Sequence, residues 1–162
     1  MKLTYSDFCV RDVKGVISLC NSWWYDSEFF KNTKMPFQTR EKYWWDLFLQ
    51  GVMMGRVGKD EKDEIRACYV AMKQPYMFNE TYIMGSEVVW CIHKEYRDGR
   101  TLIQLLNEIE ECNKNNNTAF YNLNLPVLED NDRLILKLEE KGFLKQDISM
   151  SKKTNITEKA NG

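Results

Sequence analysis

One carboxylate stands in an apolar run of the chain. Glu87 lies in IMGSEVVWCI, residues 83–92, where most neighbours are apolar. Burial disfavours the charged form of a carboxyl group and raises its pKa, so such a group can accept a proton near neutral pH. Glu87 is therefore a candidate general base. The alternative is a structural glutamate, satisfied by a backbone or arginine partner or placed at the surface of a sheet.

A turn rich in arginine follows this run, in HKEYRDGRTLIQLL, residues 93–106. N–H groups at the start of a helix attract anions, and arginine side chains bind phosphate through two parallel hydrogen bonds. Arg97 and Arg100, with Gly99 between them, therefore indicate an anion site. The alternative is that both arginines are solvated loop residues. His93, the only histidine, is expected to end the strand beside this turn rather than to act as a second base.

An aromatic segment, NSWWYDSEFFKNTKMPF at residues 21–37, contains two acidic residues. A cationic amine can be held by carboxylate pairing together with contact to aromatic faces. Trp24, Asp26 and Glu28 are therefore candidate residues for an amine substrate. The alternative interpretation is that the aromatic residues form core or homodimer contacts.

The cysteines show no pattern of a metal site. They are odd in number, lie in apolar surroundings and lack the CxxC or Cys/His spacing of common zinc sites: Cys9, Cys20, Cys68, Cys91 and Cys112. This predicts reduced thiols, mostly in the core, and no metal.

The charge balance limits the classes of partner. Lys and Arg number 23 and Asp and Glu number 24, a net charge of −1. This balance argues against nucleic acid and anionic membranes as partners and favours a small molecule or another protein. The first residues lack the pattern of a signal peptide, and no run approaches the ~20 apolar residues that span a bilayer. We therefore expect a cytoplasmic protein.

The elements that would position these residues alternate between strand and helix periodicity. One domain over 1–152 is expected, followed by a polar, disordered tail at 153–162. The pattern predicts a mixed α/β (α+β) fold. Its first half contains a strand at 1–9, a helix capped by Asp12, a helix from Thr39 with Tyr43, Trp44, Leu47 and Phe48 on one side, and a hairpin between Gly51 and Met72. Its second half contains a strand at 81–92, a helix after Gly99, a strand at 119–125, a helix capped by Asp130 or Asp132 and ended by Gly142, and a strand at 143–152.

This order resembles the GNAT superfamily of acyl-CoA N-acyltransferases. Near its C-terminus the family shows an Asn, a small residue, a Tyr and a Gly-Phe pair at fixed spacing. Asn131, Gly142 and Phe143 match that pattern, whereas Leu134 and Leu138 replace the small residue and the Tyr.

The arginine-rich turn resembles the same family less directly. Its pyrophosphate loop reads Arg/Gln-x-x-Gly-x-Gly/Ala, and aligning it on either Arg97 or Tyr96 leaves a glycine position unmatched. A phage-encoded GNAT subgroup, with Glu-x-x-Trp followed by Arg-Gly-x-Arg, is more similar. Glu87, Trp90, Arg97 and Arg100 match its pattern, and Asp98 stands where a Gly is usual.

The resemblance implies a central, mostly antiparallel sheet of six to seven strands flanked by about four helices. It also implies an N-acetyltransferase that uses acetyl-CoA as co-substrate and a primary amine as acceptor, in the host cytoplasm if the chain is phage-encoded. Backbone N–H groups near residues 90–92 would then stabilise the thioester oxyanion. The implied cofactor-binding residues are Trp90, Cys91, Ile92, Arg97, Asp98, Gly99, Arg100, Thr101 and Asn131.

Three questions about function stay open from the sequence. Leu138 stands where many relatives carry the Tyr that protonates the departing thiolate, although a thiolate of pKa ~8.5 leaves readily without that help. The degenerate turn and Leu138 together support an alternative, a non-catalytic GNAT-fold binding or virion-associated protein. An acyltransferase for longer acyl groups is a further alternative.

Overall fold

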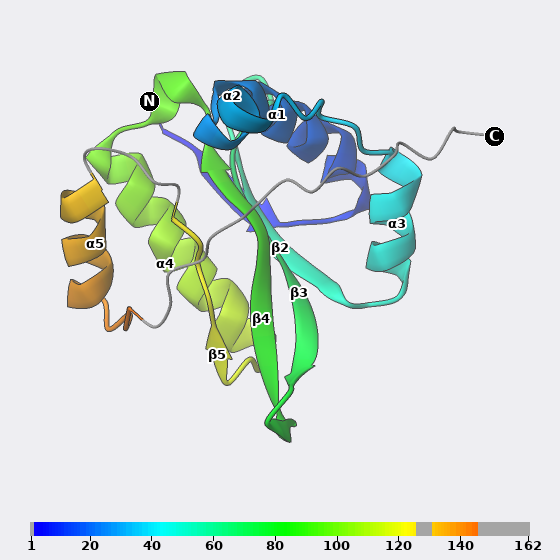
Figure 1. The fold of residues 1–162 in the computed structure, drawn as a ribbon, viewed down its shortest axis with the longest axis vertical. Coiled ribbons are helices and arrows are strands. Elements are labelled where there is room, and N and C mark those ends of the chain that lie inside the picture. Colours follow the sequence, from blue (N-terminus) through cyan, green and yellow to red (C-terminus); the bar gives the residue numbers. More distant parts are fainter. Residues whose placement is uncertain (1, 126–130, 146–162) are drawn as a thin grey trace.

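The computed structural model of the chain describes residues 2–125 and 131–145, in which a curled sheet lies between two layers of helices (Figure 1). The strand order is β1-β2-β3-β4-β5, antiparallel from β1 to β4 and parallel between β4 and β5. The strands are β1 Thr4–Asp7, β2 Met53–Lys59, β3 Ile65–Tyr76, β4 Asn79–Ile92 and β5 Phe120–Tyr121. The predicted antiparallel sheet and the hairpin of β2 and β3 are confirmed.

The described residues form five strands, so the prediction of six to seven is too high. The strand predicted at 119–125 contains only two paired residues, because the chain leaves β4 after Tyr121. Gly142, with a φ of 87°, follows the last helix as expected, but residues 143–145 form no strand. The rest of the strand predicted at 143–152 lies outside the described residues, as do Asp130 and the tail at 153–162.

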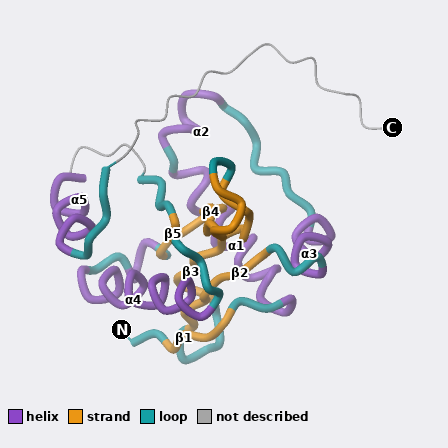
Figure 2. Tube along the Cα trace, turned by 90° about the horizontal axis from the view of Figure 1, so that it is seen from below, coloured by secondary structure: helices purple, strands orange, loops and turns teal. Residues whose placement is uncertain are grey.

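The described residues form five α-helices, four of which flank the sheet, in agreement with the prediction of about four (Figure 2). On one face lie α1, Val13–Asp26, and α3, Glu41–Leu49, and on the other lie α4, Gly99–Asn115, and α5, Asn131–Glu140. The remaining helix, α2, is Glu28–Thr33, and short 3₁₀ turns precede α1 and α4 at Val10–Asp12 and Lys94–Tyr96. None of the described helices is long and apolar enough to cross a bilayer.

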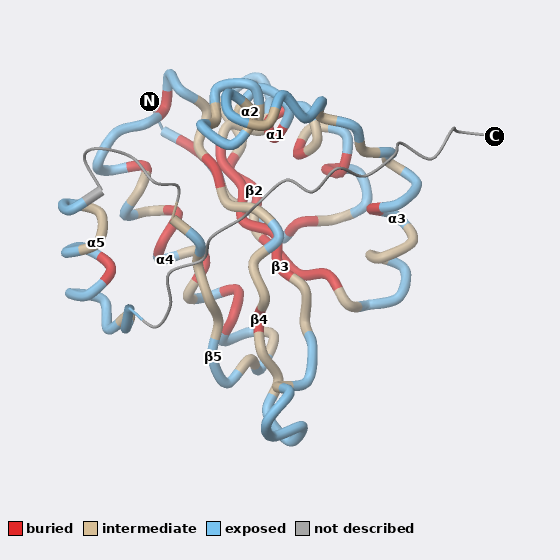
Figure 3. Tube along the Cα trace, viewed as in Figure 1, coloured by how far each residue is buried: buried red, intermediate tan, exposed pale blue. Residues whose placement is uncertain are grey.

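Apolar spacing decides which side of each helix is buried (Figure 3). On α4, the helix predicted after Gly99, one side faces the sheet, with Leu105, Leu106, Ile109 and Cys112 buried. On α3 Trp44 is buried as predicted, whereas Tyr43 is 62% exposed and does not share the buried side. A helix advances about 100° per residue, so these adjacent side chains diverge and only one reaches the core.

Two local predictions near the N-terminus need correction. The segment at 21–37 contains the unpredicted helix α2, which begins because the Ser27 hydroxyl accepts a hydrogen bond from Phe30 N–H at 3.1 Å. Asp12 does not cap α1 with its side chain. Its carboxylate accepts the Cys9 N–H at 3.0 Å and pairs with Lys59 at 2.9 Å, so it ties the turn before α1 to β2.

The hairpin of β3 and β4 extends beyond the rest of the sheet (Figure 1). At its tip Met77 is 87% exposed and Phe78 is 81% exposed. The tip lies at the opposite end of β4 from Ile92, so the two ends of this strand have different surroundings: solvent at one and the arginine-rich turn at the other.

Candidate active site

A β-bulge in β4 determines how the site is built. Val70 pairs with Val89 and Ala71 pairs with Glu87, so the register with β3 skips Val88. Side chains three residues apart point to opposite sides of an unbroken strand. The extra residue at the bulge shifts this alternation, and Glu87 and Trp90 come to the same side of β4.

Both side chains contact one backbone position in the segment after β5. The Glu87 carboxylate accepts the N–H of Asn124, and the Trp90 indole N–H donates to the carbonyl oxygen of Asn124 at 2.9 Å. The Glu87 N–H also points to the side-chain oxygen of Asn122 at 3.4 Å. The Glu-x-x-Trp spacing thus has a structural reason: together with the bulge it lets two side chains hold the backbone of the same residue, Asn124.

The ladder between β4 and β5 ends just before this position. Its two pairs are Met84 with Phe120 and Gly85 with Tyr121, and the Asn122 N–H still reaches the Gly85 carbonyl at 3.3 Å. Beyond it the hydrogen bonds between the two segments involve the side chains of Asn122, Glu87 and Trp90. Within the described residues no backbone ladder continues between β4 and this segment, so an extended ligand can lie along this edge of β4.

Burial raises the pKa of Glu87 to about 7, while the hydrogen bond from Asn124 opposes the shift. The direction expected for a carboxyl group in an apolar strand is confirmed. At neutral pH such a group is close to half ionised, so it can both accept and release a proton. The structure thus places a titratable group at the end of the β4–β5 ladder.

The turn after β4 is held from the β2–β3 side. The His93 N–H donates to the Arg66 carbonyl at 2.7 Å, which extends the sheet by one bond. The Arg66 guanidinium lies 5.7 Å from the centroid of the buried Tyr96 ring and pairs with Asp60 at 2.8 Å. Because Tyr96 is packed beneath the turn, the four residues that follow it are presented at the surface.

Those four residues, Arg97 to Arg100, are all exposed. Arg97 bends back so that its Nε–H donates to the Ile92 carbonyl at 2.9 Å. Asp98 caps α4: its carboxylate accepts the Thr101 N–H at 2.7 Å, and this bond lowers the pKa of Asp98. A Cβ added at Gly99 would have no neighbour within 4 Å, so the space over this backbone is open to a ligand.

The other predicted cofactor residues differ in accessibility. Trp90 and Ile92 pack on the α4 side of the sheet, whereas the Cys91 side chain is buried on the α1 side, so only its backbone could face a ligand at the β4–β5 edge. Thr101 is also buried, and its N–H is engaged by Asp98. The side chain of Asn131 lies outside the described residues.

The structure separates the three residues predicted for an amine. Asp26 lines a pocket of about 160 Å³ together with Ser22, His93, Lys94 and Arg97. Glu28 is exposed and pairs with Lys31 at 2.6 Å on α2. The Trp24 indole donates to the Met35 carbonyl at 2.8 Å and its ring lies 5.3 Å from that of Phe29. Of the three, Asp26 alone joins the pocket, while Trp24 holds the segment that follows α1.

Some residues of the site were not predicted. Asn122 and Asn124 orient Glu87, and Ser22 and Lys94 line the pocket. The alternating asparagines of YNLNL stand out in the sequence, but the sequence does not reveal which residues of β4 they contact. Leu138, where relatives carry a Tyr, is buried against α4 and offers no group to a leaving thiolate.

Comparison with solved structures shows which known proteins share this fold. An aminoglycoside acetyltransferase from an uncultured soil metagenomic sample superposes with a TM-score of 0.69 at 12% identity, over 97% of this chain and 100% of that one. The fold is that of the GNAT acetyltransferases. No protein-family model and no curated protein sequence matches the chain.

Two further structures share the fold across nearly the whole chain. Glucosamine-6-phosphate N-acetyltransferase from Arabidopsis thaliana gives a TM-score of 0.67 at 13% identity, covering 96% of this chain and 100% of its own. A predicted acetyltransferase with acetyl-CoA from Clostridium acetobutylicum gives 0.65 at 14% identity, covering 93% and 96%. At such identities the likeness establishes the fold and leaves the residues of each site to be argued individually.

Proposed function

We propose that this protein is an N-acetyltransferase that moves an acetyl group from acetyl-CoA to a primary amine. The observation that carries the proposal is Glu87, a carboxyl group with a pKa of about 7 placed beside the β4 bulge where the ladder to β5 ends. The shared fold with acetyltransferases supports it.

The reaction needs a free amine, stabilisation of an oxyanion and a leaving thiolate. Glu87 takes a proton from the incoming ammonium, directly or through water, and the amine then attacks the thioester carbonyl. Backbone N–H groups of β4, at residues 90–92 or at the neighbouring bulge, receive the negative charge on the carbonyl oxygen. The C–S bond breaks, the attacking nitrogen releases its extra proton to solvent to leave the amide, and the thiolate of CoA departs and takes a proton from solvent.

Acetyl-CoA would lie between the edge of β4 and the start of α4. The arm that carries the thioester runs beside Glu87 and Trp90, along the edge of β4 where the ladder to β5 has ended. The pyrophosphate meets Arg97, Arg100 and the open backbone at Gly99. The likeness to an acetyltransferase with bound acetyl-CoA supports this cofactor.

The acceptor would approach from the pocket that contains Asp26. An ammonium group beside this carboxylate gains charge pairing, and the pocket also carries Lys94, which suits an acceptor with both cationic and anionic groups. An amino sugar phosphate and an aminoglycoside, the kinds of acceptor in the names of two structural neighbours, are therefore the first amines to assay, beside a polyamine and a lysine peptide.

The proposal is tested first by binding. Acetyl-CoA at about 100 times its Kd should stabilise the folded protein by ~2.7 kcal/mol in a thermal shift assay. CoA and longer acyl-CoAs in parallel define the acyl preference. Gly99→Ala should weaken the effect without destabilising the protein, because its Cβ meets nothing in the unliganded structure but would meet a phosphate. The absence of any shift with all these ligands would reject the cofactor.

A second candidate function has its own observation. Asp98 already occupies the Thr101 N–H with a carboxylate, so part of the anion site at the start of α4 is filled by the protein itself. This favours a GNAT-fold protein that binds a partner without catalysis. Such a protein would show no thermal shift with acetyl-CoA and no release of free CoA thiol with any amine.

A further inference from the structure

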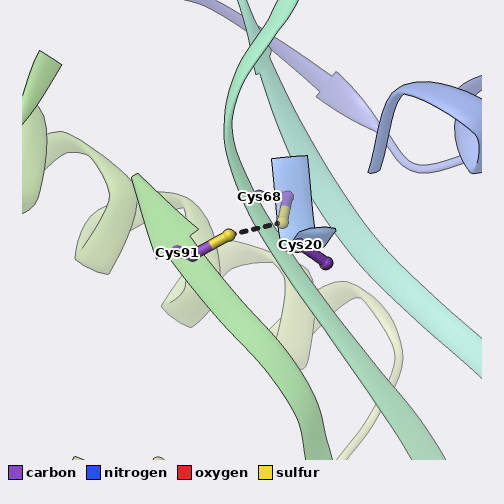
Figure 4. Close-up of side chains that lie close together, drawn as sticks. All are labelled: Cys20, Cys68 and Cys91. Carbon is purple, nitrogen blue, oxygen red and sulfur yellow. Dashed lines mark hydrogen bonds between the residues drawn. The ribbon is translucent and has the colours of Figure 1, made fainter. Parts of the chain in front are cut away.

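Three cysteines that are far apart in the sequence meet in the core between α1 and the sheet (Figure 4). Cys20 comes from α1, Cys68 from β3 and Cys91 from β4, and their exposed fractions are 5%, 0% and 5%. Cys68 and Cys91 are direct partners in the β3–β4 ladder. The cluster lies on the α1 face, whereas Trp90 packs on the opposite face of the same strand.

The sulfur positions fit one metal ion. The Sγ atoms of Cys68 and Cys91 are 3.6 Å apart, and all three Sγ atoms lie within 4.8 Å of one another. With a metal–sulfur distance of about 2.3 Å, three sulfurs in trigonal planar coordination around one ion are separated by about 4 Å. The Cys68–Cys91 separation is slightly shorter than that value and the other two separations are at most 4.8 Å, so small side-chain rotations would close the site. Each ligand stands on a regular helix or strand, which fixes its position before a metal arrives.

The number of ligands and their surroundings select the ion. No fourth Cys, His, Asp or Glu joins the group within the described residues, and the three cysteines belong to the apolar core cluster on the α1 face, which also contains Val13, Val16, Val57 and Val70. Zinc prefers four ligands, and an open fourth position normally holds water, which this apolar core does not favour. Cu(I) is soft, prefers thiolates and is satisfied by three of them.

We propose that Cys20, Cys68 and Cys91 form a binding site for one Cu(I) ion. On binding, three Cu–S bonds form and the thiols that still carry protons lose them to solvent, with no change of oxidation state. Hydrogen bonding to the Cys20 sulfur, together with burial, raises the pKa of Cys68 and Cys91, whereas hydrogen bonds from these two thiols lower the pKa of Cys20 to about 5, so Cys68 and Cys91 are the thiols that release protons.

The ion would join α1 to the two longest strands. Ser22 and His93 follow Cys20 and Cys91 by two residues each, and both line the pocket beside Arg97. A metal at the cluster therefore fixes the spacing between the two walls of that pocket. The proposal does not depend on acetyltransferase activity, because metal binding is measured on the protein alone.

The test is Cu(I) binding by the reduced, anaerobic full-length chain, in competition with a chromophoric Cu(I) chelator. Cu(I) is added to the folded protein in one arm and is present during refolding in a second arm, because the cluster is buried. We expect one ion per chain by native mass spectrometry, an ultraviolet thiolate-to-copper charge-transfer band, and a higher Tm. Zn(II) and Mg(II) are run in parallel.

Variants separate the cluster from general thiol binding. Cys20→Ala, Cys68→Ala and Cys91→Ala should each weaken Cu(I) binding at least tenfold. Cys112→Ala is the matched control, since Cys112 is equally buried but lies in the core on the α4 face, and it should bind as the wild type does. If one variant fails to fold, the other two decide the result. Equal binding by cluster and control variants, no copper in either arm, or tighter binding of Zn(II) would each overturn the proposal.

Discussion

The two halves of the proposed acetyl-CoA site are prepared to different degrees. At the edge of β4, Glu87 and Trp90 are held by the backbone of Asn124, and burial has already moved the pKa of Glu87 to about 7. At the start of α4, Arg97 and Arg100 are exposed. The group that takes the proton is thus held in place before the ligand binds, whereas phosphate binding depends on exposed side chains, of which Arg97 makes one hydrogen bond to the Ile92 carbonyl.

This difference follows from where each half lies in the fold. A bulge inside a long strand is fixed by its neighbours on β3. A side chain at the bulge therefore already has its direction and loses little further entropy when a ligand binds. Exposed arginines lose side-chain entropy when they bind, and solvent screens their charge. The comparison predicts that changes at Glu87 affect turnover and that changes in the turn affect affinity.

The largest expected effect is on turnover. Glu87→Gln keeps the shape and removes the proton acceptor, so kcat at neutral pH should fall ~10²-fold or more while the Kd of acetyl-CoA stays within twofold. Steady-state kinetics with the best acceptor and calorimetric titration of acetyl-CoA measure the two quantities. The matched control is Glu80→Gln, an exposed glutamate on the same strand, which should leave both unchanged.

The next effect is on affinity. Arg97→Ala combined with Arg100→Ala removes two charge-assisted contacts of ~1.5 kcal/mol each, at the lower end because both residues are exposed, and should weaken CoA binding ~10²-fold. The double variant Arg11→Ala with Arg40→Ala loses the same charge elsewhere on the surface and serves as control. Equal affinity for both double variants would remove the turn from the cofactor site.

A smaller effect separates the two acidic residues of the aromatic segment. Asp26→Asn should raise the KM of a cationic acceptor about two- to fivefold, as expected for an exposed ion pair of ~0.2–1 kcal/mol. Glu28→Gln should not, because Glu28 lies on α2 paired with Lys31 rather than in the pocket. If the two variants raise the KM for the acceptor and for acetyl-CoA alike, the pocket does not hold the amine.

The smallest effect concerns Asp98, which caps α4 at the start of the proposed anion site. Asp98→Asn keeps the cap on α4 but removes a negative charge from the anion site, so the Kd of acetyl-CoA should improve about two- to fivefold. The Tm should change little, since Asn caps helices as well as Asp does. A weaker affinity would show that the Asp98 carboxylate supports the site rather than competing with the phosphates.

Features with a local signal were predictable from the sequence. The helical spacing of apolar residues after Gly99 predicted the helix α4, which buries those residues. The apolar run around Glu87 predicted that the pKa of Glu87 is raised. The short helix α2 was not predicted because it depends on one capping bond to Ser27. The prediction for α3 placed Tyr43 on the same side as Trp44, although Tyr43 is exposed.

Features that join distant segments were not predictable. No sequence pattern marks the bulge at Val88 or the peptide of Asn124, because each exists only in the register between strands. The same reason explains the cysteines: Cys20, Cys68 and Cys91 lack any metal-site spacing along the chain, yet α1, β3 and β4 bring them together. Residue spacing along the sequence can reveal a site whose residues lie in one segment. The contacts of Asn124 and the cluster of three cysteines each combine residues from several segments.

The direct test of the central claim is the pH dependence of turnover in wild type and Glu87→Gln, from about pH 6 to pH 10 with saturating acetyl-CoA. Because the pKa of Glu87 is raised to about 7, the base is protonated and inactive below that pH, so wild-type turnover should rise through pH 7 and then level off. The variant should be slow at neutral pH and should rise only as the amine itself loses its proton, near the ordinary amine pKa of ~10.4. Parallel profiles for the two proteins would contradict the assignment of Glu87 as the base.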